Sequence, residues 1–196
     1  RIRQKHRELE HSLANQLHGK VQGALSATYL KLANALKQDD VSAGSLTEYR
    51  ENLVENILSL GEAGSRPFKF DEAVDETART WENVCEVQVH VEDQLRELIY
   101  TDSLLCHALE DLLPELAFNA VKHGRAKHLD IHIELTTERT IRLTAQDDGS
   151  EISPSERMGI GSKLLDECCI GWTRSSNERG TTVVAELPLN RTDLQP

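Results

Sequence analysis

The hydrophobic pattern changes type at residues 64–70, "GSRPFKF", and this change constrains the fold more than any other feature of the chain. Before it, apolar residues recur at helical spacing, whereas beyond it several runs alternate apolar and polar residues as strands do. Glycine, serine and proline in the stretch itself are typical of a break between elements. We therefore predict two domains, residues 1–63 and 71–196, joined by a linker at 64–70.

The first domain is predicted to contain two amphipathic helices. Residues 1 to about 38 contain no proline, and Ser45 with Glu48 forms a capping box that opens the second helix. Because two helices cannot bury both apolar stripes alone, we expect an antiparallel hairpin that pairs with a second copy as a four-helix bundle. The two stripes are Leu9, Leu13, Leu17, Val21, Leu25, Leu32 and Leu36, and Tyr49, Leu53, Ile57 and Leu60.

The second domain is predicted to be an α/β two-layer sandwich, which makes the chain α+β in class. Expected strands lie at 84–91, 128–135, 139–146 and 180–189, and expected helices lie around Val74 to Trp81, at about 101–122 and at 159–169. Pro114 falls inside the second of these helices, where an interior proline costs about 3 kcal/mol. We expect a kink or a break just before Glu115.

Composition restricts the possible partners. The formal net charge of -11 opposes general attraction to nucleic acid and to anionic membranes, so a protein or small-molecule partner is favoured. No apolar run approaches the roughly 20 residues that cross a bilayer. The cysteines show neither C-x-x-C pairing nor zinc spacing, so we expect reduced, buried thiols, as in a cytoplasmic protein. Those residues are Cys85, Cys106, Cys168 and Cys169, and Trp81 and Trp172 are also expected in the core.

The segment "PELAFNAVKHG" places four polar side chains at helical spacing in an apolar helix: Glu115, Asn119, Lys122 and His123. Positions i, i+4, i+7 and i+8 lie on or beside one stripe. The surrounding leucines and alanines leave little room for an ordinary solvated face. A carboxylate, an amide and two cations together suit a metal ion with an anionic ligand.

Three glycine-containing segments follow in the sequence. "QDDGS" exposes Asp147 at the end of a strand, and "MGIGS" puts Gly159 and Gly161 before a helix, where backbone N–H groups and the helix dipole favour an anion. "GTT" at 180–182 opens the last strand. Each segment alone is common in ordinary loops, but their order is specific.

This ordered set resembles the ATP-binding module of the GHKL superfamily over about residues 70–190. Upstream, "LANQLHGKVQGAL" is similar to the dimerisation and phosphoacceptor helix of sensor histidine kinases of the nitrate- and fluidity-sensor subclass. Nearly the whole chain thus resembles the catalytic core of a two-component sensor histidine kinase. The resemblance implies ATP and Mg²⁺ as cofactors.

The resemblance also implies roles around the phosphates. Asn119 would ligate Mg²⁺, and Glu115 would order a nearby water or base. Lys122 and His123 would face the phosphates, and His18 would accept the γ-phosphoryl group. These residue types suit phosphoryl transfer, which requires charge neutralisation and positioning rather than covalent help.

Around the adenine ring, the resemblance implies that Asp147 accepts a hydrogen bond from the adenine amino group and that Gly149 lets the ring approach. Gly159 and Gly161 would form a mobile lid over the triphosphate, and Thr181 would back the adenine pocket.

Two positions depart from the family pattern. Gly19 follows His18 where an acid is usual, which removes the expected general base, and Glu151 replaces the second glycine of the first glycine box. Three hypotheses stay open. The first is a protein-histidine kinase acting as a homodimer through residues 1–63 and passing phosphate to a response-regulator aspartate. The second is a histidine phosphotransfer or scaffold protein with a degenerate nucleotide domain, and the third is a serine kinase of the anti-sigma type.

Without the ATP module, His18 would be taken for a solvated surface histidine. A cytoplasmic location is predicted, either as a free protein or as the cytoplasmic part of a longer, membrane-bound sensor.

Overall fold

The structure is a computed structural model that describes residues 21–37, 69–137, 140–150 and 160–189, together with parts of 44–54. The chain divides into two compact units, Arg1–Pro67 and Phe68–Pro196. Their junction lies within the stretch predicted as a linker, although the first helix of the second unit already begins at Phe70. The two units are described separately.

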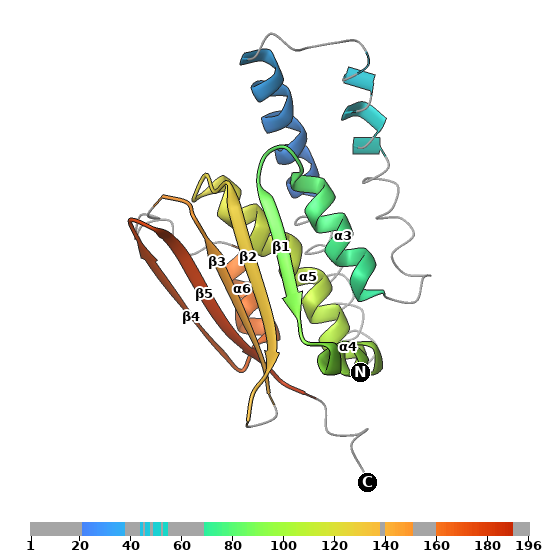
Figure 1. Cartoon of the computed structure of the whole chain (residues 1–196), viewed down its shortest axis with the longest axis vertical. Helices are drawn as coiled ribbons and strands as arrows, with labels where there is room; N and C mark the ends of the chain where they lie inside the picture. The colour runs from blue at the N-terminus through green and yellow to red at the C-terminus, as the bar shows by residue number, and fades with distance from the viewer. Residues whose placement is uncertain are drawn as a thin grey trace, which may run out of the picture. The chain divides into compact units, whose positions relative to one another are not determined.

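In the first unit, residues 21–37 form a helix, and every described residue between 44 and 54 is helical (Figure 1). The two predicted helices are confirmed over these parts. Ala24 and Ala27 are buried, but Leu25 and Leu36 of the predicted stripe are 49% and 67% exposed. The single chain therefore leaves part of the apolar stripe in solvent. His18 and Gly19 lie outside the described residues.

A five-stranded sheet, ordered β1-β2-β3-β5-β4, forms the frame of the second unit (Figure 1). The strands are β1 (Glu86–Val91), β2 (His128–Leu135), β3 (Ile141–Asp147), β4 (Gly171–Asn177) and β5 (Gly180–Leu187). β1 pairs with β2 in parallel, and the other pairs are antiparallel. A parallel pair needs a crossover connection. Two helices supply it, α4 (Asp93–Thr101) and α5 (Ser103–Lys122).

In the described part of the second unit, helices cover one face of this sheet. α3 (Phe70–Trp81) and α6 (Ile160–Cys168) pack on either side of α5 (Figure 1). Along β2, Leu129, Ile131 and Ile133 are buried while the alternate residues are exposed. We call the exposed side, which carries His128, Asp130 and His132 of β2, the open face. The predicted α+β class, with helices on one side of a sheet, is confirmed.

α5 is the central helix of the second unit. Asp102 caps it, since its side chain accepts hydrogen bonds from the N–H groups of Leu104 and Leu105. The helix runs without interruption through Pro114, so the predicted break is wrong. Apolar side chains are buried along its whole length, and each large one contributes about 1.5–3 kcal/mol. That sum exceeds the cost of one interior proline.

The sequence analysis left out two elements. α4 precedes α5 and is separated from it by the cap at Asp102. β4 is an edge strand with a polar sequence, "GWTRSSN", in which no residue is fully buried. Among the described strands it pairs with β5 alone, and it lacks the apolar alternation that identified the other strands.

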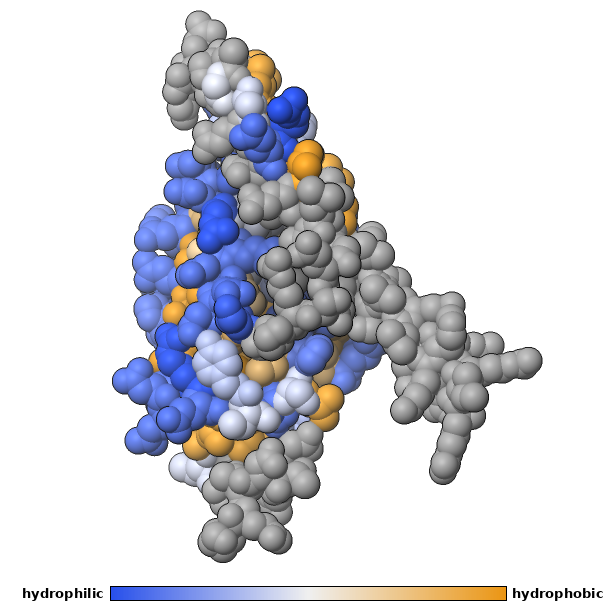
Figure 2. Space-filling view, turned by 90° about the vertical axis from the view of Figure 1, so that its right-hand side faces the viewer, coloured by the Kyte–Doolittle hydropathy of each residue, from blue (hydrophilic) through white to orange (hydrophobic). Residues whose placement is uncertain are grey.

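The described surface seen in Figure 2 is mainly hydrophilic, with apolar residues in separate groups. Among the residues that the structure describes, no helix combines the length and apolar composition needed to cross a membrane.

Candidate functional site

A pocket lies between the C-terminal half of α5, the sheet, and α6. It brings together four residues that the sequence analysis selected, Asn119, His123, Asp147 and Thr181. Apolar side chains of α5, α6 and the sheet complete most of its wall. Predicted residues from three separate elements, α5 with its C-cap, β3 and β5, thus meet at one place.

Asp147, the last residue of β3, lies at the base of this pocket and is only 7% exposed. Its Oδ1 accepts hydrogen bonds from the N–H groups of Gly149 at 2.8 Å and Thr181 at 3.1 Å. Burial raises the pKa of Asp147 above its usual value, although these two hydrogen bonds partly oppose the rise. Its Oδ2 receives no hydrogen bond from the described residues. A ligand with a polar N–H group can therefore bind there.

Two glycines allow the backbone to close around Asp147. Gly180 has a φ of 127°, and a Cβ at this position would lie 1.7 Å from the Asp147 carbonyl oxygen. A Cβ on Gly149 would lie 2.6 Å from the carbonyl oxygen of Gly124. Only glycine fits at either position. Gly149 is therefore required for packing against the loop after α5, in addition to the access for a base that the resemblance implies.

Glu115 and Asn119 lie one turn apart on α5 and are hydrogen-bonded. The Asn119 Nδ2 group donates to Glu115 Oε1 at 2.8 Å. Glu115 is buried and Asn119 reaches the pocket wall. Since the amide nitrogen is engaged, the amide oxygen of Asn119 is the atom that can face a cation in the pocket.

The two basic side chains at the end of α5 differ in position. His123 lines the pocket, but the Lys122 ammonium lies 4.7 Å from the centroid of the Phe118 ring. Phe118 precedes Lys122 by one helical turn and contacts Trp81 of α3, so this cation–π contact directs Lys122 along the other side of the helix. The structure therefore brings His123, and not Lys122, to the pocket.

β4 and α6 contribute pocket residues that the sequence analysis missed. Arg174 and Trp172 of β4 and Ser162 of α6 line the wall. The i, i+2 spacing of Trp172 and Arg174 was the available signal, because alternate strand residues share a face. Trp172, predicted to be core, is only half-buried and donates its indole N–H to Asp166 at 2.8 Å.

The remaining predicted site residues are less well placed. Gly161 falls within the first turn of α6 and not before the helix. Gly159 and Glu151, like His18, lie outside the described residues. Their roles stay predictions.

The thiols are poor nucleophiles. Burial raises the pKa of Cys85 and Cys168 to about 12, and that of Cys106 and Cys169 to about 11. They are therefore protonated at neutral pH, as expected for structural cysteines. Cys168 and Cys169 are only half-buried, however, where the sequence analysis predicted buried thiols.

Within the described part of the chain, no group of three or more histidine, cysteine or carboxylate side chains could hold a metal ion. This does not conflict with Mg²⁺, which typically takes one or two protein ligands and completes its shell with water and substrate phosphates. A single amide oxygen at Asn119 suits that mode of binding.

Solved structures of histidine kinases are similar to this chain. A blue-light activated histidine kinase from Erythrobacter litoralis EL346 superimposes with a TM-score of 0.50 at 17% identity, over 96% of this chain and 62% of that chain. The histidine kinase domain of that kinase gives 0.49 at 14% identity over 95% and 94% of the two chains. The Acinetobacter baumannii histidine kinase AdeS gives 0.42 at 17% identity over 89% and 98%.

The chain thus spans less than two thirds of the longer blue-light activated kinase. No protein-family model matches the sequence, and no curated protein sequence is detectably similar to it. At 17% identity the likeness establishes that the fold is that of a histidine kinase core. Activity has to be argued from the pocket.

Proposed function

We propose that the chain is the ATP-dependent protein-histidine kinase core of a two-component system. It would bind ATP with Mg²⁺ in the pocket around Asp147 and transfer the γ-phosphoryl group to His18. The bond between the γ-phosphorus and its bridging oxygen breaks as the bond to the imidazole nitrogen forms, and ADP leaves. A response-regulator aspartate is the final acceptor.

The observation that carries this proposal is the environment of Asp147. This buried carboxylate lines the pocket, and two backbone N–H groups donate to one of its oxygens, which leaves the other oxygen as a candidate acceptor for a ligand. An exocyclic amino group satisfies that acceptor, whereas the 6-oxo group of guanine would face it acceptor to acceptor. Leu165 and Val183 supply apolar wall for the flat faces of a base. Adenine is therefore the nucleobase that the site suits.

The polar side of the pocket suits phosphates and a metal ion. Asn119 offers an amide oxygen, held in place by its hydrogen bond to Glu115. His123 and Arg174 line the same pocket and can neutralise phosphate charge. Mg²⁺ bound there with the nucleotide would supply further neutralisation of the transferred group.

Nucleotide binding requires the pocket to widen. Its volume here is about 70 Å³, well below the roughly 300–1,000 Å³ of typical small-molecule sites. Ser162 and Leu165 of α6 line one wall of the pocket. Outward movement of α6, whose first turn contains the predicted lid residue Gly161, would provide the space.

Homodimerisation through residues 1–63 is part of the proposal. It is supported by the exposure of Leu25 and Leu36 on the described helix, because apolar side chains in solvent favour association. A cytoplasmic location belongs to the same proposal.

The alternative, a phosphotransfer or scaffold protein with a degenerate nucleotide domain, rests on Gly19 and Glu151 alone. The described pocket does not favour it, because Asp147 and Asn119 line one pocket and Asn119 is held by its hydrogen bond to Glu115.

Calorimetric titration of the full chain with ATP, and separately with GTP, in the presence of Mg²⁺ tests the proposal. We expect saturable binding of ATP and much weaker binding of GTP. Absence of heat with ATP at millimolar concentration would overturn it.

A further inference from the structure

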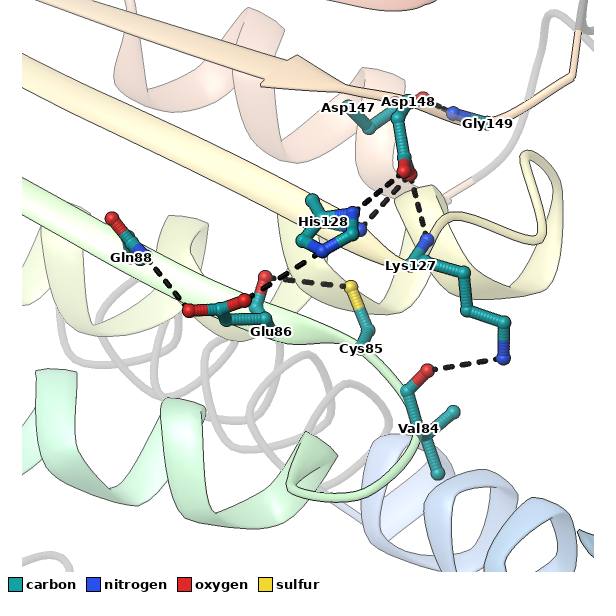
Figure 3. Close-up of polar contacts among 9 residues, drawn as sticks. All are labelled: Val84, Cys85, Glu86, Gln88, Lys127, His128, Asp147, Asp148 and Gly149. Carbon is teal, nitrogen blue, oxygen red and sulfur yellow. Dashed lines mark hydrogen bonds and ion pairs between the residues drawn. The ribbon is translucent and has the colours of Figure 1, made fainter.

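A second carboxylate, Asp148, follows Asp147 and has the opposite orientation. Asp147 is directed into the pocket, whereas the Asp148 side chain is 44% exposed on the open face. Figure 3 shows its carboxylate pointing at His128, the first residue of β2, and at Lys127, which precedes that strand. No nucleotide role follows from this exposed position by itself.

Asp148 makes an unusually complete set of hydrogen bonds for an exposed side chain. Its Oδ1 accepts the backbone N–H groups of Lys127 at 2.7 Å and His128 at 2.9 Å, and its Oδ2 lies 2.8 Å from Nδ1 of the His128 ring. Its own backbone N–H donates to the His128 carbonyl at 3.2 Å. Burial alone would raise the pKa of Asp148, but the hydrogen bonds from His128 and Lys127 lower it to about 2. The side chain therefore stays ionised and bonded at all ordinary pH values.

These bonds join the two segments that carry the pocket residues. One segment connects the end of α5, which carries Asn119 and His123, through Gly124 to His128 at the start of β2. The other is the end of β3 with Asp147. Ser150 adds a backbone hydrogen bond to the Gly124 carbonyl at 2.7 Å, close to the Gly124 and Gly149 backbone contact.

The same group of residues reaches β1. The His128 Nε2 atom lies 3.6 Å from Glu86 Oε2, and the Lys127 ammonium lies 3.4 Å from the Val84 carbonyl (Figure 3). Asp148 therefore lies at the junction of β1, β2 and β3 and fixes the end of β3 from the side opposite the pocket.

We propose that Asp148 is a positioning residue for the nucleotide site. It sets the distance between the base acceptor on Asp147 and the metal ligand on Asn119 without touching the nucleotide. This inference rests on the proposed ATP binding. Placement of both groups to within about half an ångström matters, because small displacements of positioned groups weaken binding strongly.

The test compares ATP affinity among variants of the full chain by calorimetry, with folding checked by circular dichroism. Asp148→Ala removes all three side-chain contacts, and we expect about tenfold weaker ATP binding. Asp148→Asn keeps an oxygen for the two backbone N–H groups and should bind within about twofold of wild type. The matched control is Asp130→Ala, since Asp130 is an open-face carboxylate that forms an ion pair with His90 at 3.8 Å.

Rescue by asparagine with loss in alanine supports the positioning role. Wild-type affinity in a folded Asp148→Ala variant overturns it while leaving the proposed ATP binding intact. Absence of ATP binding by wild type overturns both. If Asp148→Ala does not fold, Asp148→Glu decides, because it keeps the charge and shifts the carboxylate by one methylene: weaker ATP binding supports the inference, and unchanged binding overturns it.

Discussion

Two adjacent carboxylates on opposite sides of the sheet have pKa values that are shifted in opposite directions. On the pocket side, burial raises the pKa of Asp147. On the open face, burial would also raise the pKa of Asp148, but hydrogen bonds from His128 and Lys127 lower this pKa to about 2. The strand places neighbours on opposite faces. A single dipeptide thus supplies a ligand-binding group and a structural anchor, and residue type alone does not distinguish them.

The largest expected difference in ATP binding is between substitutions of two amide side chains, one on each side of the sheet. Asn119 in the pocket and Gln88 on the open face both donate to a carboxylate at 2.8 Å. Asn119→Ala removes a proposed metal ligand, so it should abolish ATP binding or weaken it tenfold or more, about 1.4 kcal/mol. Calorimetry with and without Mg²⁺ measures this effect.

Gln88→Ala serves as the control and should bind ATP like wild type. Equal ATP affinities for the two alanine variants would contradict the claim that the pocket side binds ATP and the open face does not.

Asp147→Asn should separate binding from stability. The amide oxygen can still accept from Gly149 and Thr181, but an NH₂ group then faces the adenine amino group, so we expect about tenfold weaker ATP binding. The fold should become more stable at neutral pH. A raised carboxyl pKa stabilises the fold at low pH, and this contribution is lost as the pH rises through the folded-state pKa.

Thermal unfolding of wild type and Asp147→Asn across pH 3 to 8 measures the second effect. The advantage of the variant should grow with pH and vanish at low pH, where Asp147 is protonated. A variant that is less stable than wild type at pH 7 would contradict the assigned environment of Asp147.

A smaller effect is expected on the open face at His128. The hydrogen bond to Asp148 raises the pKa of His128. Its contribution to stability should be complete below about pH 6.5 and be lost as the pH rises through the raised value. His128→Gln should therefore lower the melting temperature more at pH 6 than at pH 9.

His132→Gln is the control for this measurement, because His132 stacks on His90 on the same face without contacting Asp148. If the melting temperatures of both variants depended equally on pH, the pair of Asp148 and His128 would make no specific contribution to stability.

The parts of the site that could be predicted depend on local periodicity. Helical spacing placed Glu115, Asn119 and His123 correctly near one another, because α5 is a regular helix that packing maintains even through Pro114. Lys122 could not be placed in the same way. Its direction is set by the ring of Phe118, and that contact depends on a side-chain rotamer rather than on spacing.

The omissions have different physical causes. β4 lacks apolar alternation, so the i, i+2 spacing of Trp172 and Arg174 indicates a shared face only once the pairing with β5 identifies the segment as a strand. Asp148 alternates away from Asp147 by strand geometry, but its partners come from about 20 residues earlier in the chain. Sequence patterns report the face of a strand and not the long-range contacts on it.

The measurement that tests the central claim most directly is Mg²⁺-dependent phosphorylation of His18 by γ-labelled ATP. Wild type should acquire acid-labile phosphate, and His18→Gln should acquire none. Gly19→Asp should label faster, because a positioned general base contributes about 10² to 10⁴ in rate. If wild type and Gly19→Asp both bind ATP and neither labels His18, the kinase proposal is contradicted. Labelling only from a phosphorylated response regulator would instead identify a phosphotransfer protein.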